Sequence, residues 1–170
     1  MIIKILGATL ILAACGGVGF KIAANYIKEE RTIRQLIYIL DFMSSEMQYR
    51  LTPLPELCKQ AANESKGVLS RVFAKLSEEM VNQIAPNVSH CMSAALSSRT
   101  DIPPTTLEML QVLGNSLGRF DMNGQLRGLD AVRSQCKEKL NDLIQNKDVR
   151  LRSYKTLGLC AGAAMVILFI

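Results

Sequence analysis

The sequence predicts an all-α protein: a compact helical bundle of about six helices flanked by an N-terminal and a C-terminal transmembrane helix. Three observations lead to this prediction. Apolar residues recur at spacings of three and four through most of the chain, which is the period of an amphipathic helix. No stretch alternates apolar and polar residues over a useful length, so no sheet is expected. Both ends of the chain carry long apolar runs with little or no charge.

Residues 1–27 are predicted to form the N-terminal transmembrane helix. An uncharged run covers residues 5–20, is interrupted by Lys21 and then continues for three more apolar residues. About 20 helical residues span roughly 30 Å, which crosses a hydrocarbon core if the Lys21 amine extends toward the headgroups. Ala13 and Gly17 form a small-x-x-x-small pair, so they are predicted to pack against another helix in the membrane.

The sequence allows two interpretations of the side of the membrane on which the central domain lies. Leu-Ala-Ala-Cys, ending at Cys15, resembles a bacterial lipoprotein cleavage box, which would make Cys15 the lipidated N-terminus of an exported protein. The charges favour a cytoplasmic central domain, because lysines and arginines beside membrane segments stay on the cytoplasmic side. Only Lys4 and the amino terminus flank the outer side. The basic residues on the inner flanks are Lys21, Lys28, Arg31, Arg34, Lys147, Arg150, Arg152 and Lys155.

Residues 28–155 are predicted to form a cytoplasmic α-helical bundle. Its first helix continues out of the membrane over residues 29–49 with one apolar face. Thr52 is expected to cap the next helix, with Pro53 at the first helical position, a frequent pairing at helix N-termini. Further helices are predicted over residues 69–80 and 105–117, with a short amphipathic turn or two over residues 88–96.

A long final helix is predicted to begin at Asp121, which is expected to be its N-cap. Residues 156–170 carry no charge, and these 15 residues make roughly 22 Å of helix, a short C-terminal transmembrane segment. Gly158 and Gly162 form a G-x-x-x-G pair that is predicted to pack against the first span. The alternative is that these glycines only reflect the high glycine content of membrane helices. The polar half of the helix carries one apolar stripe: Leu129, Val132, Cys136, Leu140 and Leu143.

The composition argues against several classes of function. Aromatic residues make up only 5% with no tryptophan, and the net charge of +5 gathers beside the apolar ends, so nucleic-acid binding is not expected. Five cysteines without paired spacing predict buried reduced thiols rather than disulfides. His90 is the only histidine, and the chain has no phosphate-binding loop motif. We therefore expect no enzyme activity, no cofactor, no metal site and no small-molecule substrate.

The pair Glu78-Glu79 is expected to be a solvated helix face.

Three features of the sequence occur together. They are Lys-Ile-Leu-Gly-Ala at residues 4–8, the turn Thr52-Pro53-Leu54, and the stretch from Leu113 to Asp121. With the apolar C-terminal run, these features make the whole chain resemble the stage III sporulation protein AB family of endospore-forming bacteria. The resemblance implies a helical domain similar to the cytoplasmic domain of the type II secretion platform protein F. It also implies a place in the channel complex between mother cell and forespore, with a secretion-type ATPase as partner.

The resemblance places the family's turn into the final helix on Gly114, Leu117, Gly118, Asp121 and Gln125. These residues have a structural interpretation. Gly118 allows the preceding helix to stop, Asp121 caps the next helix, and Gly114 lets two helices approach. Gln125 is expected to form hydrogen bonds within the same corner. The alternative is that these residues belong to a surface that binds a partner directly.

We therefore expect a non-enzymatic platform or scaffold subunit of a secretion-like channel complex, needed for endospore formation. It would dock a cytoplasmic secretion-type ATPase and contact other channel subunits. Its expected location is the mother-cell membrane that engulfs the forespore, with two spans and a cytoplasmic central domain. Arg119, Arg127 and Arg133 are the candidate partner-facing charges. The alternatives are a membrane-anchored signalling adaptor and an exported lipoprotein lipidated at Cys15.

Overall fold

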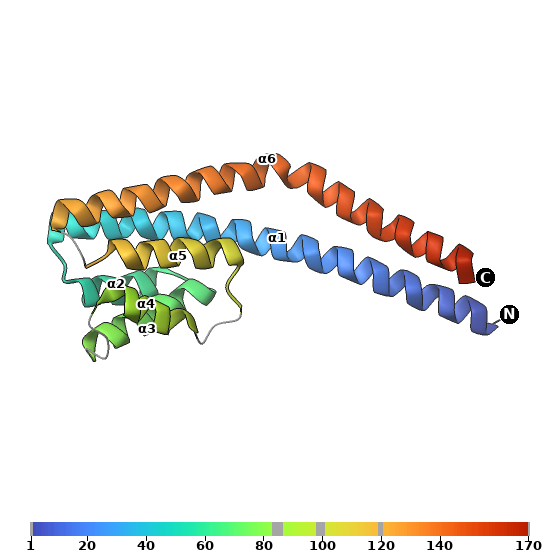
Figure 1. Cartoon of the computed structure of the whole chain (residues 1–170), viewed down its shortest axis with the longest axis horizontal. Coiled ribbons are helices and arrows are strands. Elements are labelled where there is room, and N and C mark those ends of the chain that lie inside the picture. The colour runs from blue at the N-terminus through green and yellow to red at the C-terminus, as the bar shows by residue number, and fades with distance from the viewer. Residues whose placement is uncertain (1, 83–86, 98–100, 119–120, 170) are drawn as a thin grey trace. The chain divides into compact units, whose positions relative to one another are not determined.

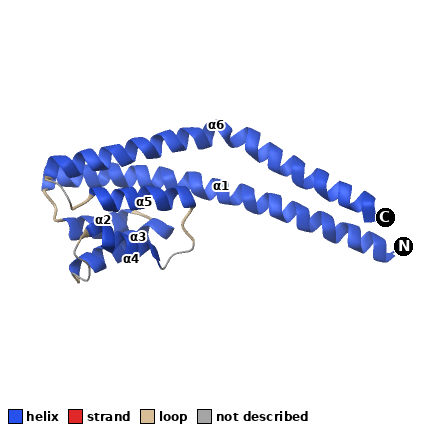
Figure 2. Ribbon diagram, in the orientation of Figure 1, coloured by secondary structure: helices blue, strands red, loops and turns tan. Residues whose placement is uncertain are grey.

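The computed structural model describes the backbone of residues 2–82, 87–97, 101–118 and 121–169, and the side-chain surroundings of residues 21–82, 87–97, 101–118 and 121–145. This part of the chain is all-helical and has no strand, as predicted (Figures 1 and 2). Its helices are α1 (Ile2–Arg50), α2 (Leu54–Glu64), α3 (Gly67–Val81), α4 (Val88–Ser97), α5 (Pro104–Ser116) and α6 (Met122–Phe169).

The helices divide into two compact units. The first unit consists of Met1–Glu30 with Asn141–Ile170, and the second is Arg31–Leu140. The long helices α1 and α6 therefore contribute to both units. The predicted bundle, residues 28–155, also includes residues 28–30 and 141–155, which the structure groups with the first unit.

The second unit buries the apolar faces that the periodicity predicts. Phe73 of α3 is fully buried and is the largest side chain of the core. The core brings together stripes from α1, the short helices and α6, because each amphipathic helix hides its apolar side from water. Its members from α1 are Ile33, Leu36, Ile39, Leu40, Met43 and Met47. The others include Leu57, Leu69, Val72, Leu76, Leu110, Leu113, Leu129, Val132 and Cys136.

Two of the short helices begin in the same way, directly after a proline. Pro53 and Pro103 have nearly identical backbone angles, with φ −58° and ψ 143° for the first and φ −59° and ψ 141° for the second. The carbonyl of Pro53 accepts a hydrogen bond from Leu57 N at 2.9 Å, and that of Pro103 accepts one from Leu107 N at 2.9 Å. Each proline therefore occupies the N-cap position itself.

The predicted N-cap at Thr52 is wrong for this reason. Because Pro53 has an extended ψ, it lies outside the helix, and α2 begins one residue later than predicted, at Leu54. The Thr52 hydroxyl instead donates to Glu46 Oε2 at 3.4 Å, back toward the end of α1.

Among the described residues, no helix holds a segment that is both long and apolar enough to cross a membrane. The structure therefore gives no support to the two predicted transmembrane helices, residues 1–27 and 156–170. Most of these residues lie outside the part of the chain whose side-chain surroundings are described. The same holds for the predicted membrane-packing residues Ala13, Gly17, Gly158 and Gly162.

Candidate partner-binding surface

One end of the second unit gathers segments that are far apart in the sequence. Ser77 Oγ, near the end of α3, donates to the carbonyl of Pro55 at the start of α2, at 2.8 Å. A Cβ on Gly118, just after α5, would lie 3.7 Å from Leu54 Cδ2, also at the start of α2. The end of α3, the start of α2 and the end of α5 therefore meet.

The C-terminal end of α1 and the N-terminal end of α6 lie at this same end of the second unit. Arg133 of α6 donates through Nη1 to Asp41 Oδ1 of α1 at 2.6 Å, so the two helices run side by side there. α1 ends nine residues after Asp41, and α6 begins eleven residues before Arg133. At 1.5 Å per residue these distances are roughly 14 and 16 Å along the two helices. In Figure 1 the end of α1 and the start of α6 lie together at the left side.

Large apolar side chains are exposed at this end. Tyr49, Leu51 and Val81 are the three most exposed large hydrophobic residues of the described chain, at 80%, 67% and 66%. Met122 joins them at the start of α6. Single exposed apolar residues are ordinary, but a group at one end of a bundle is typical of an interaction site. We call Tyr49, Leu51, Val81 and Met122 the tip surface.

Leu51, one of the residues of the tip surface, carries backbone strain. Its φ is +54°, which makes it the only non-glycine residue of the described chain in the left-handed region. That conformation costs an L-residue about 1–2 kcal/mol. Burial does not explain it, because the side chain is 67% exposed. A strained residue that presents an apolar side chain to water indicates a functional constraint on this turn.

Most of the turn residues singled out in the sequence come together at this end. Thr52 and Pro53 connect α1 to α2, while Leu117, Gly118 and Asp121 connect α5 to α6. Leu117 is fully buried. Gly118 has a φ of +73°, and a Cβ there would overlap Val88 Cγ2 of α4. The α1–α2 and α5–α6 connections, more than 60 positions apart in the sequence, thus lie together in one corner of the second unit.

The other turn residues lie close to this corner. Asp121 Oδ1 accepts a hydrogen bond from Gly124 N at 3.0 Å, so its carboxylate caps α6. Gln125 N donates to the Asp121 carbonyl at 2.9 Å in the first turn of that helix. Gly114 lies on α5, where a Cβ would be 2.6 Å from Met92 Cβ. The absence of a side chain at Gly114 therefore lets α5 approach α4 closely.

The three candidate partner-facing arginines differ in their surroundings. Arg119 lies outside the described residues. Arg127 is exposed on α6, whereas Arg133 is only partly exposed and is held within the chain. Its guanidinium donates to Asp41 and, at 2.5 Å, to Asp130 Oδ1, and the hydrogen bond to Asp41 contributes most to raising the pKa of Arg133. Asp41 on α1 therefore holds the guanidinium of Arg133 within the chain, and the role of Arg133 as a partner-facing charge stays a prediction.

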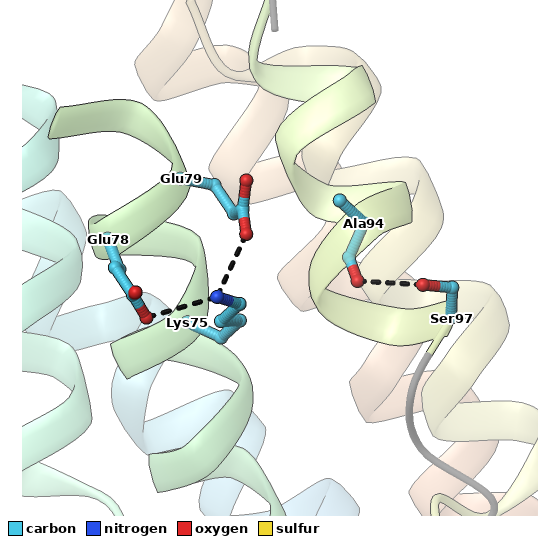
Figure 3. Close-up of polar contacts among 5 residues, drawn as sticks. All are labelled: Lys75, Glu78, Glu79, Ala94 and Ser97. Carbon is cyan, nitrogen blue, oxygen red and sulfur yellow. Dashed lines mark hydrogen bonds and ion pairs between the residues drawn. The ribbon is translucent and has the colours of Figure 1, made fainter. Parts of the chain in front are cut away.

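A second correction concerns the carboxylate pair on α3. Lys75 Nζ lies 3.2 Å from Glu78 Oε2 and 3.0 Å from Glu79 Oε1 (Figure 3). Glu78 is exposed, but Glu79 is buried on the side of α3 that faces α4. Neighbouring helix positions point about 100° apart, so the two carboxylates have different environments. The hydrogen bond to Glu79, more than the one to Glu78, raises the pKa of Lys75.

The described thiols are poorly suited to chemistry. Cys58, Cys91 and Cys136 are free and buried, as predicted. Burial raises the pKa of Cys58 to about 12 and that of Cys136 to about 11. These thiols therefore remain protonated at neutral pH, and a protonated thiol is a weak nucleophile. No group of three His, Cys, Asp or Glu side chains in the described chain is arranged to hold a metal ion.

The residues of the tip surface were not singled out in the sequence. Tyr49 and Leu51 flank the Thr52-Pro53 turn, and that turn is the one available signal for their position. Met122 continues an ordinary apolar spacing, four residues before Leu126, and Val81 directly follows Met80 at the end of a predicted helix. Neither position distinguishes an exposed end of a helix from a buried one. Their exposure depends on where the neighbouring helices stop.

The six helices of the described chain and the exposed tip surface define a helical-bundle protein with a surface suited to protein contacts. The chain belongs to the stage III sporulation protein AB family, whose family model matches residues 4–170. One relative is the stage III sporulation protein AB of Bacillus subtilis (strain 168), which is 25% identical over 169 residues and covers 98% of each chain. The family predicted from the sequence is therefore confirmed.

A solved structure described as stage III sporulation protein AB has the same fold. It aligns with a TM-score of 0.63 at 21% identity and covers 72% of this chain and 98% of its own. Membership of the family supports a role in sporulation. The likeness of the central domain to the type II secretion platform protein F stays a prediction.

Proposed function

We propose that this chain is a non-enzymatic platform subunit of a secretion-like channel complex between mother cell and forespore. In this role it docks a secretion-type ATPase and contacts other channel subunits, and it uses neither a nucleic acid nor a small-molecule substrate. The main observation that supports the proposal is the exposure of apolar side chains on the tip surface. Family membership supports the sporulation context.

The tip surface fits a docking role for physical reasons. Tyr49, Leu51 and Val81 expose apolar area that a partner would remove from water, which is the main source of affinity at protein interfaces. Two carboxylates near the tip surface already have partners within the chain. Glu46 accepts from Thr52, and Asp121 caps α6. The tip surface therefore offers an apolar contact beside two carboxylates that are held by the chain itself.

Anchoring in the membrane completes the proposal. The uncharged runs at residues 5–20 and 156–170 are the sequence features that support two spans. The excess of lysine and arginine beside them supports a central domain on the cytoplasmic side of the mother-cell membrane. With both ends of the chain anchored in the membrane, the protein would act as a scaffold. It would hold an ATPase next to a membrane channel and so couple the two.

Co-purification tests the docking of the ATPase. The full-length chain is tagged and recovered in mild detergent from sporulating cells, and the retained ATPase is quantified at moderate salt. Leu51→Glu and Val81→Glu each place a charge on the tip surface, and we expect each to reduce the retained ATPase at least tenfold. Ala131→Glu is the matched control, because Ala131 is exposed on α6 away from the tip.

Two outcomes contradict this proposal in different ways. If the unmodified chain retains no ATPase, docking itself is wrong. If the tip variants fold normally and retain the ATPase as well as Ala131→Glu does, the docking site lies elsewhere. Circular dichroism and thermal unfolding of each variant separate lost binding from lost structure.

A further inference from the structure

The chain has a single asparagine that is followed directly by glycine, Asn123-Gly124, in the first turn of α6. Such an asparagine is chemically reactive, because the backbone nitrogen of the next residue can attack its side-chain amide carbon. Glycine hinders this attack least, since it has no Cβ and adopts backbone conformations that other residues avoid. The Asn123 side chain is also exposed, so water, the other reactant, has access to it.

The first turns of α6 are weakly held. None of the residues from Met122 to Gly128, all of which the structure describes, is buried, and Leu129 is the first that is. Gly124 and Gly128 both lie in this segment, and glycine lowers the stability of a helix relative to alanine. A helix end with little buried surface opens more often than a packed one.

Two hydrogen bonds to Asp121 keep the first turn closed. The Asp121 carboxylate accepts from Gly124 N at 3.0 Å, and the Asp121 carbonyl accepts from Gln125 N at 2.9 Å. Gly124 N is also the atom that would attack Asn123. Because this nitrogen cannot donate to Asp121 and attack Asn123 at the same time, the cap must open before the reaction begins.

We propose that Asn123 is a site of spontaneous deamidation and that the Asp121 cap sets its rate. In the first step Gly124 N forms a bond to Asn123 Cγ, and the Cγ–Nδ2 bond breaks. The proton of Gly124 N leaves with the side-chain nitrogen as ammonia, and a succinimide ring remains. Water then opens the ring at Cγ to give aspartate, or at the backbone carbonyl carbon to give isoaspartate. No oxidant, reductant or enzyme takes part.

Either product places a new carboxylate beside Met122 of the tip surface. Aspartate in the first turn is favoured by the dipole of α6, so this product keeps the helix start. Isoaspartate adds a methylene group to the backbone and disrupts the hydrogen bonds of the turn. A charge that must lose water when an apolar surface is covered weakens that contact. The effect on docking rests on the proposed function, whereas the modification itself does not.

Incubation of the purified full-length chain in mild detergent at mildly alkaline pH tests the modification. Peptide mass mapping follows the replacement of NH2 by OH at each asparagine, and an isoaspartyl methyltransferase assay detects isoaspartate. We expect the product at Asn123 to form at least roughly tenfold faster than at Asn63 or Asn115, which are exposed but not followed by glycine. Equal rates at the three positions would overturn the proposal.

Variants of the cap test what sets the rate. Asp121→Ala should speed deamidation about fivefold, because loss of an N-cap raises the fraction of open first turns by roughly that factor. Asp121→Ser is the matched control: serine caps as well as aspartate, so the rate should stay within about twofold. An equal rate in Asp121→Ala and the unmodified chain would show that the cap does not control the reaction.

A variant of the attacking residue tests the chemical step. Gly124→Ala should slow deamidation at least roughly tenfold, because alanine stabilises the helix and its Cβ hinders the attack. Asn123→Gln should remove the isoaspartate signal. Circular dichroism establishes that each variant is folded. An unchanged rate in a folded Gly124→Ala chain would overturn the attack by Gly124 N.

Co-purification of the ATPase separates this inference from the proposed function. Asn123→Asp imitates the aspartate product, whereas Asn123→Gln stays neutral. We expect Asn123→Asp to retain about threefold less ATPase than Asn123→Gln. Equal retention would overturn the effect of deamidation on docking. If the unmodified chain retains no ATPase while Asn123 still deamidates, the docking role fails and the modification site stands.

Discussion

At the residue scale, Gly118 has two separate reasons to be glycine. Its φ of +73° lies in the left-handed region, and a Cβ would overlap Val88. Gly67 has a similar φ of +64°, but a Cβ there would meet nothing within 4 Å. Substitution at Gly67 therefore tests backbone strain alone, whereas substitution at Gly118 tests backbone strain together with steric overlap.

We expect Gly118→Ala to destabilise the chain by about 2–4 kcal/mol, because strain and overlap add. Gly67→Ala should cost about 1–2 kcal/mol from strain alone. Denaturant unfolding of the full-length chain measures both values. Adding Val88→Ala should recover part of the Gly118→Ala loss and none of the Gly67→Ala loss. Equal losses for the two glycine variants would contradict the role assigned to Val88.

At the scale of elements, the Asp41–Arg133 pair joins α1 to α6 across 92 residues of sequence. The side chains are partly exposed, at 47% for Asp41 and 35% for Arg133, so solvent screens much of their attraction. Because Arg133 also binds Asp130 of its own helix, its guanidinium is already held in position when it meets Asp41. The pair should therefore contribute more than an ordinary surface pair.

A double-mutant cycle with Asp41→Asn and Arg133→Met measures this contribution. We expect a coupling free energy of about 1 kcal/mol that falls as salt is raised. The matched control is Glu56–Lys59, a more exposed pair 3.9 Å apart within α2, for which we expect about 0.3 kcal/mol. A coupling at Asp41–Arg133 no larger than that of the control would show that packing alone aligns the two helices.

At the scale of the whole molecule, the proposal requires the second unit to face the cytoplasm. A cysteine introduced at Lys66, which is exposed between α2 and α3, reports this in a chain whose native cysteines are replaced. We expect a membrane-impermeant thiol reagent to label Lys66→Cys only after the cells are opened. Labelling of intact cells would instead favour the exported lipoprotein lipidated at Cys15.

Much of this organisation was predictable from the sequence. The periods of three and four placed the helices and the faces that they bury, because those periods follow from the backbone geometry of a helix. Asp121 was recognisable as a cap because its short carboxylate reaches the free N–H groups of the next turn. The family could be recognised from the turn residues between Leu113 and Asp121, and its model matches residues 4–170.

The sequence by itself determined roughly where the helices lie, which of their faces are apolar and which family the chain belongs to, since these depend on local spacing and residue type. Only the tertiary structure decided that Glu79 is buried beside Lys75, that Arg133 pairs with Asp41, and that Leu51 and Val81 lie exposed at one end. Those features depend on where helices distant in sequence stop and meet. Burial and pairing are properties of such contacts, and no single helix carries them alone.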